Sequence, residues 1–174
     1  MVTVHTLIGV LFALIVGQRL SELRLARRNE SRARENGAVE YGAAHYPLFF
    51  VLHAAWLIAW PIEAWFRDSG LPRWWPLAAF VFVAAEFLRY WAIGTLQERW
   101  NTRILVIKDH VPISTGPYRF IRHPNYVAVA LELAAVPLIF GAWWTAGLFS
   151  VLNAALLLGI RIPQEERALS GGEL

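Results

Sequence analysis

Five apolar stretches, each long enough to cross a bilayer as a helix, alternate along the chain with shorter polar segments. An α-helix rises about 1.5 Å per residue, so runs of roughly 16 to 20 apolar residues approach the thickness of about 30 Å that the hydrocarbon core has. Inside a membrane, helices satisfy their own backbone hydrogen bonds. The pattern therefore predicts an all-α, polytopic membrane bundle with five transmembrane helices, at about Val4 to Leu20, Tyr46 to Phe66, Trp74 to Ile93, Tyr126 to Trp143 and Thr145 to Ile160.

The composition supports this fold class. Of the 174 residues, 57% are hydrophobic, with nine Trp and ten Phe, and the mean hydropathy is +0.42. A soluble domain of this length could not bury so much apolar surface. Pro137 lies inside the fourth predicted helix, where its ring and missing N–H should kink or interrupt the helix. We expect a single membrane domain over residues 1–174.

Basic residues are distributed unevenly between the predicted helices. Only Arg67 and Arg73 lie between the second and third helices, and the turn at residues 141–144 has none. Because basic residues gather on the cytoplasmic side, the pattern predicts an outside N-terminus and a cytoplasmic C-terminus. The segments predicted to be cytoplasmic contain Arg19, Arg24, Arg27, Arg28, Arg32, Arg34, Arg99, Arg103, Lys108, Arg119, Arg122, Arg161 and Arg167.

Two groups of charged residues leave alternatives open. Residues 21–40 carry both signs of charge, so they could form a short helix on the lipid headgroups or a solvated loop. Glu86, Arg89 and Glu132 fall within predicted helices, and ionisable groups at that depth normally face the protein interior. Glu132 could serve the structure or line a pocket.

Charge and cysteine content exclude several classes of function. The net charge is only +3, and the basic clusters sit beside apolar helices, which favours a role in topology over nucleic-acid binding. The chain has no Cys, and therefore no disulfide, thiolate metal site or Cys nucleophile. We expect neither a nucleic-acid partner nor a metal.

The segment from His110 to Tyr126 concentrates ionisable and aromatic groups between two predicted helices. Pro124 suits the first position of a helix, whose free N–H groups can hold an anion beside His123. A histidine at a membrane interface with no such role is the simpler alternative. Gly116-Pro117 predicts a turn that folds residues 110–113 back towards residues 123–126.

A second polar group follows the fifth predicted helix. Arg161 and Glu165 are four residues apart and share a helix face, although Pro163 disturbs the geometry between them. An exposed ion pair would contribute only a few tenths of a kcal/mol, so stability is a weak reason for it. The pair instead offers an acidic group for a cationic ligand and a guanidinium for an anionic one.

These two motifs together resemble the isoprenylcysteine carboxyl methyltransferase superfamily of membrane enzymes. The resemblance rests on His-x-x-Ile-x-x-Gly-Pro-Tyr-x-x-x-Arg-His-Pro-x-Tyr over residues 110–126 and Arg-x-x-x-Glu-Glu-x-x-Leu over residues 161–169. Further segments are similar to the short bacterial members, found with type III polyketide synthases, that O-methylate alkylpyrones. These segments are residues 28–30, 37–40, 45–48, 100–102, 123–127 and 161–163.

The resemblance implies S-adenosylmethionine as cofactor, bound by about residues 97–170. Arg161 would position the oxyanion of the substrate, and His123 would be a possible base for a weakly acidic acceptor. Glu165 would be the acidic cofactor ligand. The other cofactor contacts implied are His110, Val111, Pro112, Ile113, Tyr118, His123, Pro124, Asn125 and Tyr126.

The expected reaction is O-methylation of a lipophilic acceptor that enters from the bilayer, either the hydroxyl of a long-chain alkylpyrone or a carboxylate. The expected location is the bacterial inner membrane, with membrane lipids around the protein and the active site on the cytoplasmic side. Prenylcysteine carboxyl methylation and phospholipid N-methylation are alternatives within the superfamily. A non-catalytic membrane scaffold or small transporter is an alternative of another class. The residues leave the oligomeric state open.

Overall fold

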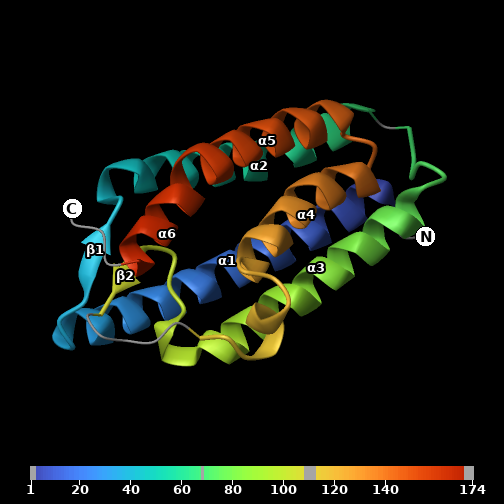
Figure 1. Ribbon diagram of the computed structural model, residues 1–174. Coiled ribbons are helices and arrows are strands. Elements are labelled where there is room, and N and C mark those ends of the chain that lie inside the picture. Colours follow the sequence, from blue (N-terminus) through green and yellow to red (C-terminus); the bar gives the residue numbers. More distant parts are fainter. Residues whose placement is uncertain (1–2, 68, 108–112, 171–174) are drawn as a thin grey trace.

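The computed structural model describes residues 3–67, 69–107 and 113–170, and Figure 1 shows long helices gathered into one bundle. The fourth helix packs against the second, third and fifth, and the first helix packs against the second. A π-helical turn, η4 (Leu157–Arg161), joins the last two helices into one rod. The helices are α1 (Val4–Glu35), α2 (Tyr46–Arg67), α3 (Trp75–Leu96), α4 (Pro124–Ile139), α5 (Trp143–Leu156) and α6 (Ile162–Leu169).

Four of the five predicted membrane crossings have helices that are long and apolar enough among the described residues: Val4–Glu35, Ala43–Arg67, Trp75–Arg99 and Trp143–Leu169. The fourth predicted helix is shorter than expected. It begins at Pro124 and ends at Ile139, so its 16 residues extend about 24 Å. Pro137 lies in its last turn, which agrees with the predicted interruption. The inside-outside orientation stays a prediction.

The prediction of an all-α fold needs one correction, because a small antiparallel sheet closes one end of the bundle (Figure 1). Strand β1 (Val39–Tyr41) pairs with β2 (Ile104–Val106), with Glu40 opposite Leu105. Three residues are too few for the alternating pattern that identifies a strand. Burial opposes ionisation of Glu40, but hydrogen bonds from Arg103 and Arg34 outweigh it and lower the pKa of Glu40.

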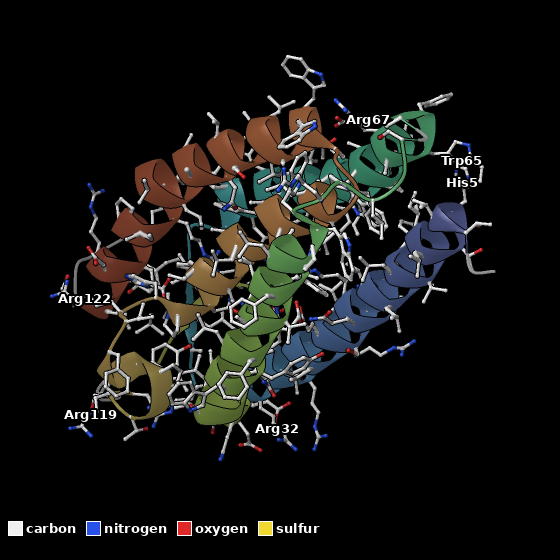
Figure 2. All side chains as sticks on the ribbon, turned by 90° about the vertical axis from the view of Figure 1, so that its right-hand side faces the viewer. His5, Arg32, Trp65, Arg67, Arg119 and Arg122 are labelled. Atoms are coloured by element: carbon white, nitrogen blue, oxygen red, sulfur yellow. The ribbon has the colours of Figure 1, made fainter. Side chains whose placement is uncertain are left out.

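Residues 21–35 form neither a separate surface helix nor a loop, because α1 continues through them to Glu35. The buried side chain of Asn29 fastens this half of α1 to the turn after α3. Its Nδ2 donates to the carbonyls of Gln97, at 3.1 Å, and Trp100, at 2.8 Å. In Figure 2, Arg32 and Arg119 mark this end of the bundle, and His5 beside Trp65 marks the other.

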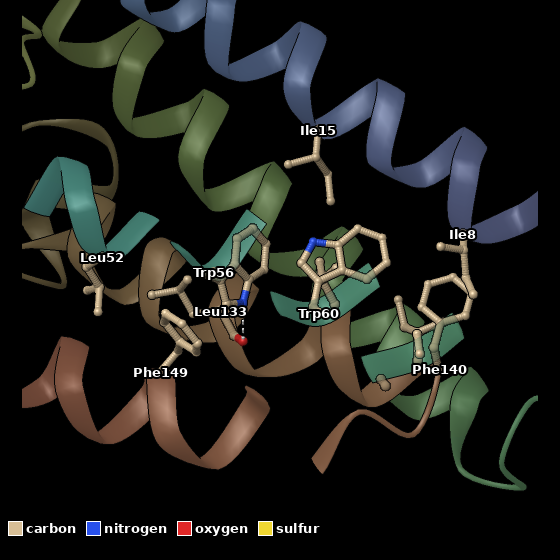
Figure 3. Close-up of a cluster of buried hydrophobic side chains, with 12 residues drawn as sticks. Ile8, Ile15, Leu52, Trp56, Trp60, Leu133, Phe140 and Phe149 are labelled. Atoms are coloured by element: carbon tan, nitrogen blue, oxygen red, sulfur yellow. Dashed lines mark hydrogen bonds between the residues drawn. The ribbon is translucent and has the colours of Figure 1, made fainter. Parts of the chain in front are cut away.

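The apolar core lies between α1, α2, α4 and α5 and is built around two tryptophans. Trp56 and Trp60 are fully buried on α2, and Figure 3 places them between Ile15, Leu133, Phe140 and Phe149. The ring of Trp60 stacks on Phe140, with 5.6 Å between the centroids. Such rings supply large buried apolar areas, so the core holds the four helices together.

A cluster of buried charges joins α1 to α3 and α4, which confirms that Glu132 and Arg89 face the interior. Glu132 is 0% exposed and is bound by both Arg19 and Arg89. Arg19 also binds Glu22 at 2.8 Å, and Arg89 lies 3.6 Å from Glu86. Glu132 is not among the residues that line the cavity described below, so its role in this structure is to bridge helices.

Candidate functional site

A cavity of about 710 Å³ lies at the end of the bundle that carries the β1–β2 sheet. Its walls come from the last turns of α1 and α3, from β2, from the start of α4, and from η4 and α6. Seven of the residues predicted for the site line this cavity: Ile113, Tyr118, His123, Asn125, Tyr126, Arg161 and Glu165. Segments far apart in the sequence thus meet around one space.

The other predicted site residues are placed differently. Pro124 is buried as the first residue of α4 and is not among the lining residues. Its contribution is to start the helix that carries Asn125 and Tyr126. His110, Val111 and Pro112 lie outside the described residues, so their proposed contacts with the cofactor stay predictions.

The predicted turn at Gly116-Pro117 is confirmed as the start of a 3₁₀ helix, η3 (Gly116–Arg119). Gly116 has a φ of +58°, which a residue with a side chain rarely adopts. A Cβ at this position would lie 2.3 Å from Oγ1 of Thr95 on α3. Glycine therefore lets η3 approach α3 closely enough for Tyr118 to form one wall of the cavity.

His123 and Tyr126 present their rings side by side at the first turn of α4. The two rings are stacked with 5.4 Å between centroids and 17° between planes. His123 immediately precedes Pro124, as predicted for a helix start. Its Nδ1 lies 3.9 Å from Glu165, and its Nε2 lies 3.5 Å from Glu166. Two carboxylates thus face the imidazole from α6.

The π-helical turn η4 explains how Arg161 enters the site despite Pro163. In a regular helix Pro163 could not donate to the carbonyl of Gly159, and its ring would clash with that carbonyl. A π-turn widens the helix locally, and such turns are frequent at functional sites. Arg161 ends this turn and is only 9% exposed.

Arg161 and Glu165 are connected through a third residue, and the structure records no direct ion pair between them. The Tyr126 hydroxyl accepts a hydrogen bond from Arg161 Nε at 2.9 Å and donates one to Glu165. Arg161 Nη2 donates to the carbonyl of Thr102 at 2.8 Å. No hydrogen bond within the described part of the chain uses Arg161 Nη1, so this N–H group is available to a ligand.

Two buried polar atoms of the site also have no hydrogen-bond partner among the described residues. They are Oδ1 of Asn125 and Nε2 of His123. Burial and the nearby Glu165 carboxylate raise the pKa of Tyr118, so its hydroxyl stays protonated at neutral pH. The cavity therefore offers an unpaired acceptor, an anionic carboxylate, neutral aromatic surfaces and a guanidinium. Such a set suits a ligand with a cationic group, hydrogen-bond donors and a flat ring.

The sequence analysis assigns no role in the site to several residues that hold it in place. Thr102 acts through its backbone carbonyl, so its side chain gives no signal. In the sequence Asn29 lies within a charged segment. It is buried because the chain after α3 passes against this part of α1. Phe49 was also missed; Arg161 lies 5.8 Å from the centroid of its ring.

Comparison with known proteins identifies relatives over most of the chain. A sequence model of the family described as "Isoprenylcysteine carboxyl methyltransferase (ICMT) family" matches residues 77–171. The uncharacterized protein YpbQ of Bacillus subtilis is 37% identical over 160 residues, which are 92% of this chain and 95% of YpbQ. An uncharacterized protein of Haemophilus influenzae is 29% identical over 94% of this chain and 95% of its own. No solved structure matches the chain.

Proposed function

Because the chain belongs to the isoprenylcysteine carboxyl methyltransferase family of S-adenosylmethionine-dependent membrane enzymes, we propose that it O-methylates an acidic, lipophilic acceptor. The acceptor we propose is the hydroxyl of a long-chain alkylpyrone or a carboxylate. Membership in an enzyme family favours this over a non-catalytic scaffold or transporter. The observation that carries the proposal is the buried guanidinium of Arg161, which is held by two hydrogen bonds while Nη1 has no hydrogen bond within the described residues.

The residues of the cavity fit S-adenosylmethionine. Glu165 would bind the amino group of its methionine part, since a carboxylate accepts a charge-assisted hydrogen bond from an ammonium. The unpaired Oδ1 of Asn125 would accept from an amino or hydroxyl group of the nucleoside. Tyr118 and the rings of His123 and Tyr126 offer surfaces for its flat base. A volume of about 710 Å³ leaves room for the reacting part of an acceptor.

When bound, S-adenosylmethionine supplies an electrophilic methyl group on a sulfonium sulfur. Arg161 has the task of holding the oxygen of the acceptor in line with that methyl group. A hydroxypyrone or a carboxylate arrives as an anion, so the guanidinium can bind it without a dedicated base. Tyr126 accepts from Nε and Thr102 accepts from Nη2, which directs Nη1 to the acceptor and reduces the freedom of the side chain.

A less acidic acceptor would need a base, and His123 is the proposed candidate. Its Nε2 is buried and has no hydrogen-bond partner among the described residues. An imidazole in this state can accept a proton from a hydroxyl, and the adjacent carboxylates of Glu165 and Glu166 would stabilise the resulting cation. The proton thus moves from the oxygen of the acceptor to Nε2 before or during transfer.

The arrangement of apolar and polar surfaces supports access from two sides. α1, α2 and α3 have exposed apolar faces, along which the lipophilic tail of an acceptor can lie while it stays in the bilayer. The cavity opens at the end of the bundle that carries Arg32, Arg99 and Arg122, which the positive-inside rule puts in the cytoplasm. We therefore propose that the cofactor binds from the cytoplasm and the acceptor enters from the membrane.

Two alternative reactions known in the family would use Arg161 differently. Phospholipid N-methylation uses a neutral amine, which gains nothing from a guanidinium. Prenylcysteine methylation uses a carboxylate, so it shares the role of Arg161 and is distinguished only by the acceptor. Mass spectrometry of products made with labelled cofactor and an alkylpyrone, a prenylcysteine or a phospholipid extract separates the three.

The decisive variant is Arg161→Ala, assayed for turnover and for cofactor binding. We expect turnover to fall by about 100-fold or more, as when a group that stabilises transition-state charge is lost. Cofactor affinity should change little, because Tyr126 can still donate to Glu165. Arg122→Ala is the control, since Arg122 also lines the cavity but is 87% exposed. Equal losses of turnover and cofactor affinity in Arg161→Ala would reject this division of roles.

A further inference from the structure

The outward face of α1 changes from apolar to basic along a single stripe. Leu7, Val10 and Leu14 are exposed, and the same stripe continues through Gly17 and Ser21 to exposed Arg24 and Arg28. Positions spaced by three and four residues lie on one helix face. Because α1 is one unbroken helix from Val4 to Glu35, the apolar and the basic parts of the stripe are held in line.

The arginines of α1 fall into two groups that differ in their partners. Three of them are paired with carboxylates of the protein: Arg19 binds Glu22 and Glu132, Arg32 binds Glu98, and Arg34 binds Glu30 and Glu40.

Arg24, Arg27 and Arg28 are all exposed, and within residues 3–67, 69–107 and 113–170 no carboxylate forms an ion pair with any of them. The three acidic residues of α1 are engaged elsewhere. Glu22 binds Arg19 and lies 3.4 Å from Arg89. Glu30 binds Arg34 and Arg103, and Glu35 accepts from Ser31. Three arginines of α1 thus have acidic partners, whereas the other three have none within the described residues.

These three arginines directly follow the apolar part of α1, which is long and apolar enough to cross a membrane. Leu20 is the last exposed large apolar side chain of α1 before them. With a rise of about 1.5 Å per residue, Arg24 follows Leu20 by about 6 Å and Arg28 by about 12 Å. The headgroup layer of each leaflet is about 5 to 8 Å thick, and arginine stems extend along the helix to reach it. With Leu20 at the edge of the hydrocarbon, their guanidinium groups can therefore reach lipid phosphates.

We propose that Arg24, Arg27 and Arg28 form a binding face for anionic phospholipid headgroups. Three uncompensated positive charges favour a lipid with net negative charge over a zwitterionic one, whose ammonium group would be repelled. Guanidinium groups also match phosphate oxygens with paired hydrogen bonds. The face lies on the same half of α1 as Arg32 and Ala33, which line the cavity, so a bound lipid would steady the helix that forms this part of the cavity wall.

The experiment is native mass spectrometry of the purified protein with equal amounts of phosphatidylglycerol and phosphatidylcholine in mild detergent. Each arginine near a lipid surface contributes on the order of 1 kcal/mol, or about fivefold. The double variant Arg24→Gln/Arg28→Gln should therefore lower the ratio of bound phosphatidylglycerol to phosphatidylcholine by about 25-fold. Detergent solution removes any effect of the substitutions on membrane orientation.

Two controls keep the result interpretable. Arg73→Gln/Arg167→Gln removes two exposed arginines that also lack ion pairs within the described residues, and it should leave the ratio unchanged. Arg24→Lys/Arg28→Lys keeps the charges and should keep the preference. If the glutamine variant does not fold, 1 M salt should abolish the preference of the wild type through screening. An equal ratio in wild type and glutamine variant, or a preference that survives 1 M salt, overturns the proposal.

Discussion

Trp56 donates its indole N–H to the backbone carbonyl of Leu133 at 3.0 Å (Figure 3). Leu133 is four residues before Pro137, and a proline cannot make the helical hydrogen bond to that carbonyl. The side chain of α2 thus supplies the donor that α4 lacks. Because both groups are buried, this bond lets a proline occupy the last turn of a helix inside the membrane.

Replacement of Trp56 by Phe should destabilise the protein by about 1 to 3 kcal/mol, since a buried carbonyl loses its donor. The free energy of unfolding in mixed detergent micelles measures this effect. In a Pro137→Ala background position 137 regains its N–H, so Trp56→Phe should cost less there. If the losses in the free energy of unfolding caused by Trp56→Phe and by Pro137→Ala simply add in the double variant, this explanation is contradicted.

Trp60 provides the matched control for Trp56. Both rings are fully buried on α2, but Nε1 of Trp60 has no hydrogen-bond partner among the described residues. Trp60→Phe therefore loses ring volume but no hydrogen bond, and it should be the less destabilising of the two. Equal destabilisation would attribute the effect of Trp56→Phe to packing alone.

Asn29 should be needed for the wall of the cavity as well as for stability. Asn29→Leu leaves the carbonyls of Gln97 and Trp100 without their side-chain donor and releases the turn in which Gln97 has a φ of +50°. We expect a loss of about 2 kcal/mol or more in stability, together with weaker cofactor binding. Asn36→Ala breaks a similar but exposed bond to Arg32 and should change stability by less than about 0.5 kcal/mol.

Gly116 should tolerate alanine less well than Gly37, although both have positive φ angles. A Cβ at Gly37 meets nothing within 4 Å, whereas one at Gly116 meets Oγ1 of Thr95 at 2.3 Å and Cβ of Thr95 at 3.2 Å. Gly37→Ala should therefore cost only the backbone strain, about 1 to 2 kcal/mol. Gly116→Ala should cost more and lower cofactor affinity, because η3 must move away from α3. Thermal unfolding and calorimetric titration test both expectations.

The sequence predicted the helices well where apolar runs were long, and less well where contacts between distant segments decide the structure. The pattern identified α2 within one residue at each end and α3 within three. It did not predict that α1 runs on to Glu35, because that extension is fastened by Asn29 to a turn nearly 70 residues away. The pattern did not predict strands β1 and β2 for the same reason, since each is stabilised by a partner strand more than 60 residues away.

The sequence predicts which residues belong to the candidate site better than it predicts how those residues contact one another. His123, Tyr126, Arg161 and Glu165 stood in recognisable motifs, and they do meet at one cavity. The hydroxyl of Tyr126 that joins Arg161 to Glu165 was not foreseen, because helical spacing suggested a direct contact between the two. The roles of these residues in binding and catalysis stay proposals.

The most direct test of the account is calorimetric titration of S-adenosylmethionine into the purified protein in detergent. Wild type should bind saturably at one site. Glu165→Gln keeps an acceptor for Tyr126 but removes the charge, so affinity should fall about 10-fold to 100-fold. Glu166→Gln, at a neighbouring residue that is 49% exposed, should change it much less. Absence of saturable binding to wild type, or equal affinities in wild type and Glu165→Gln, would contradict the proposed cofactor site.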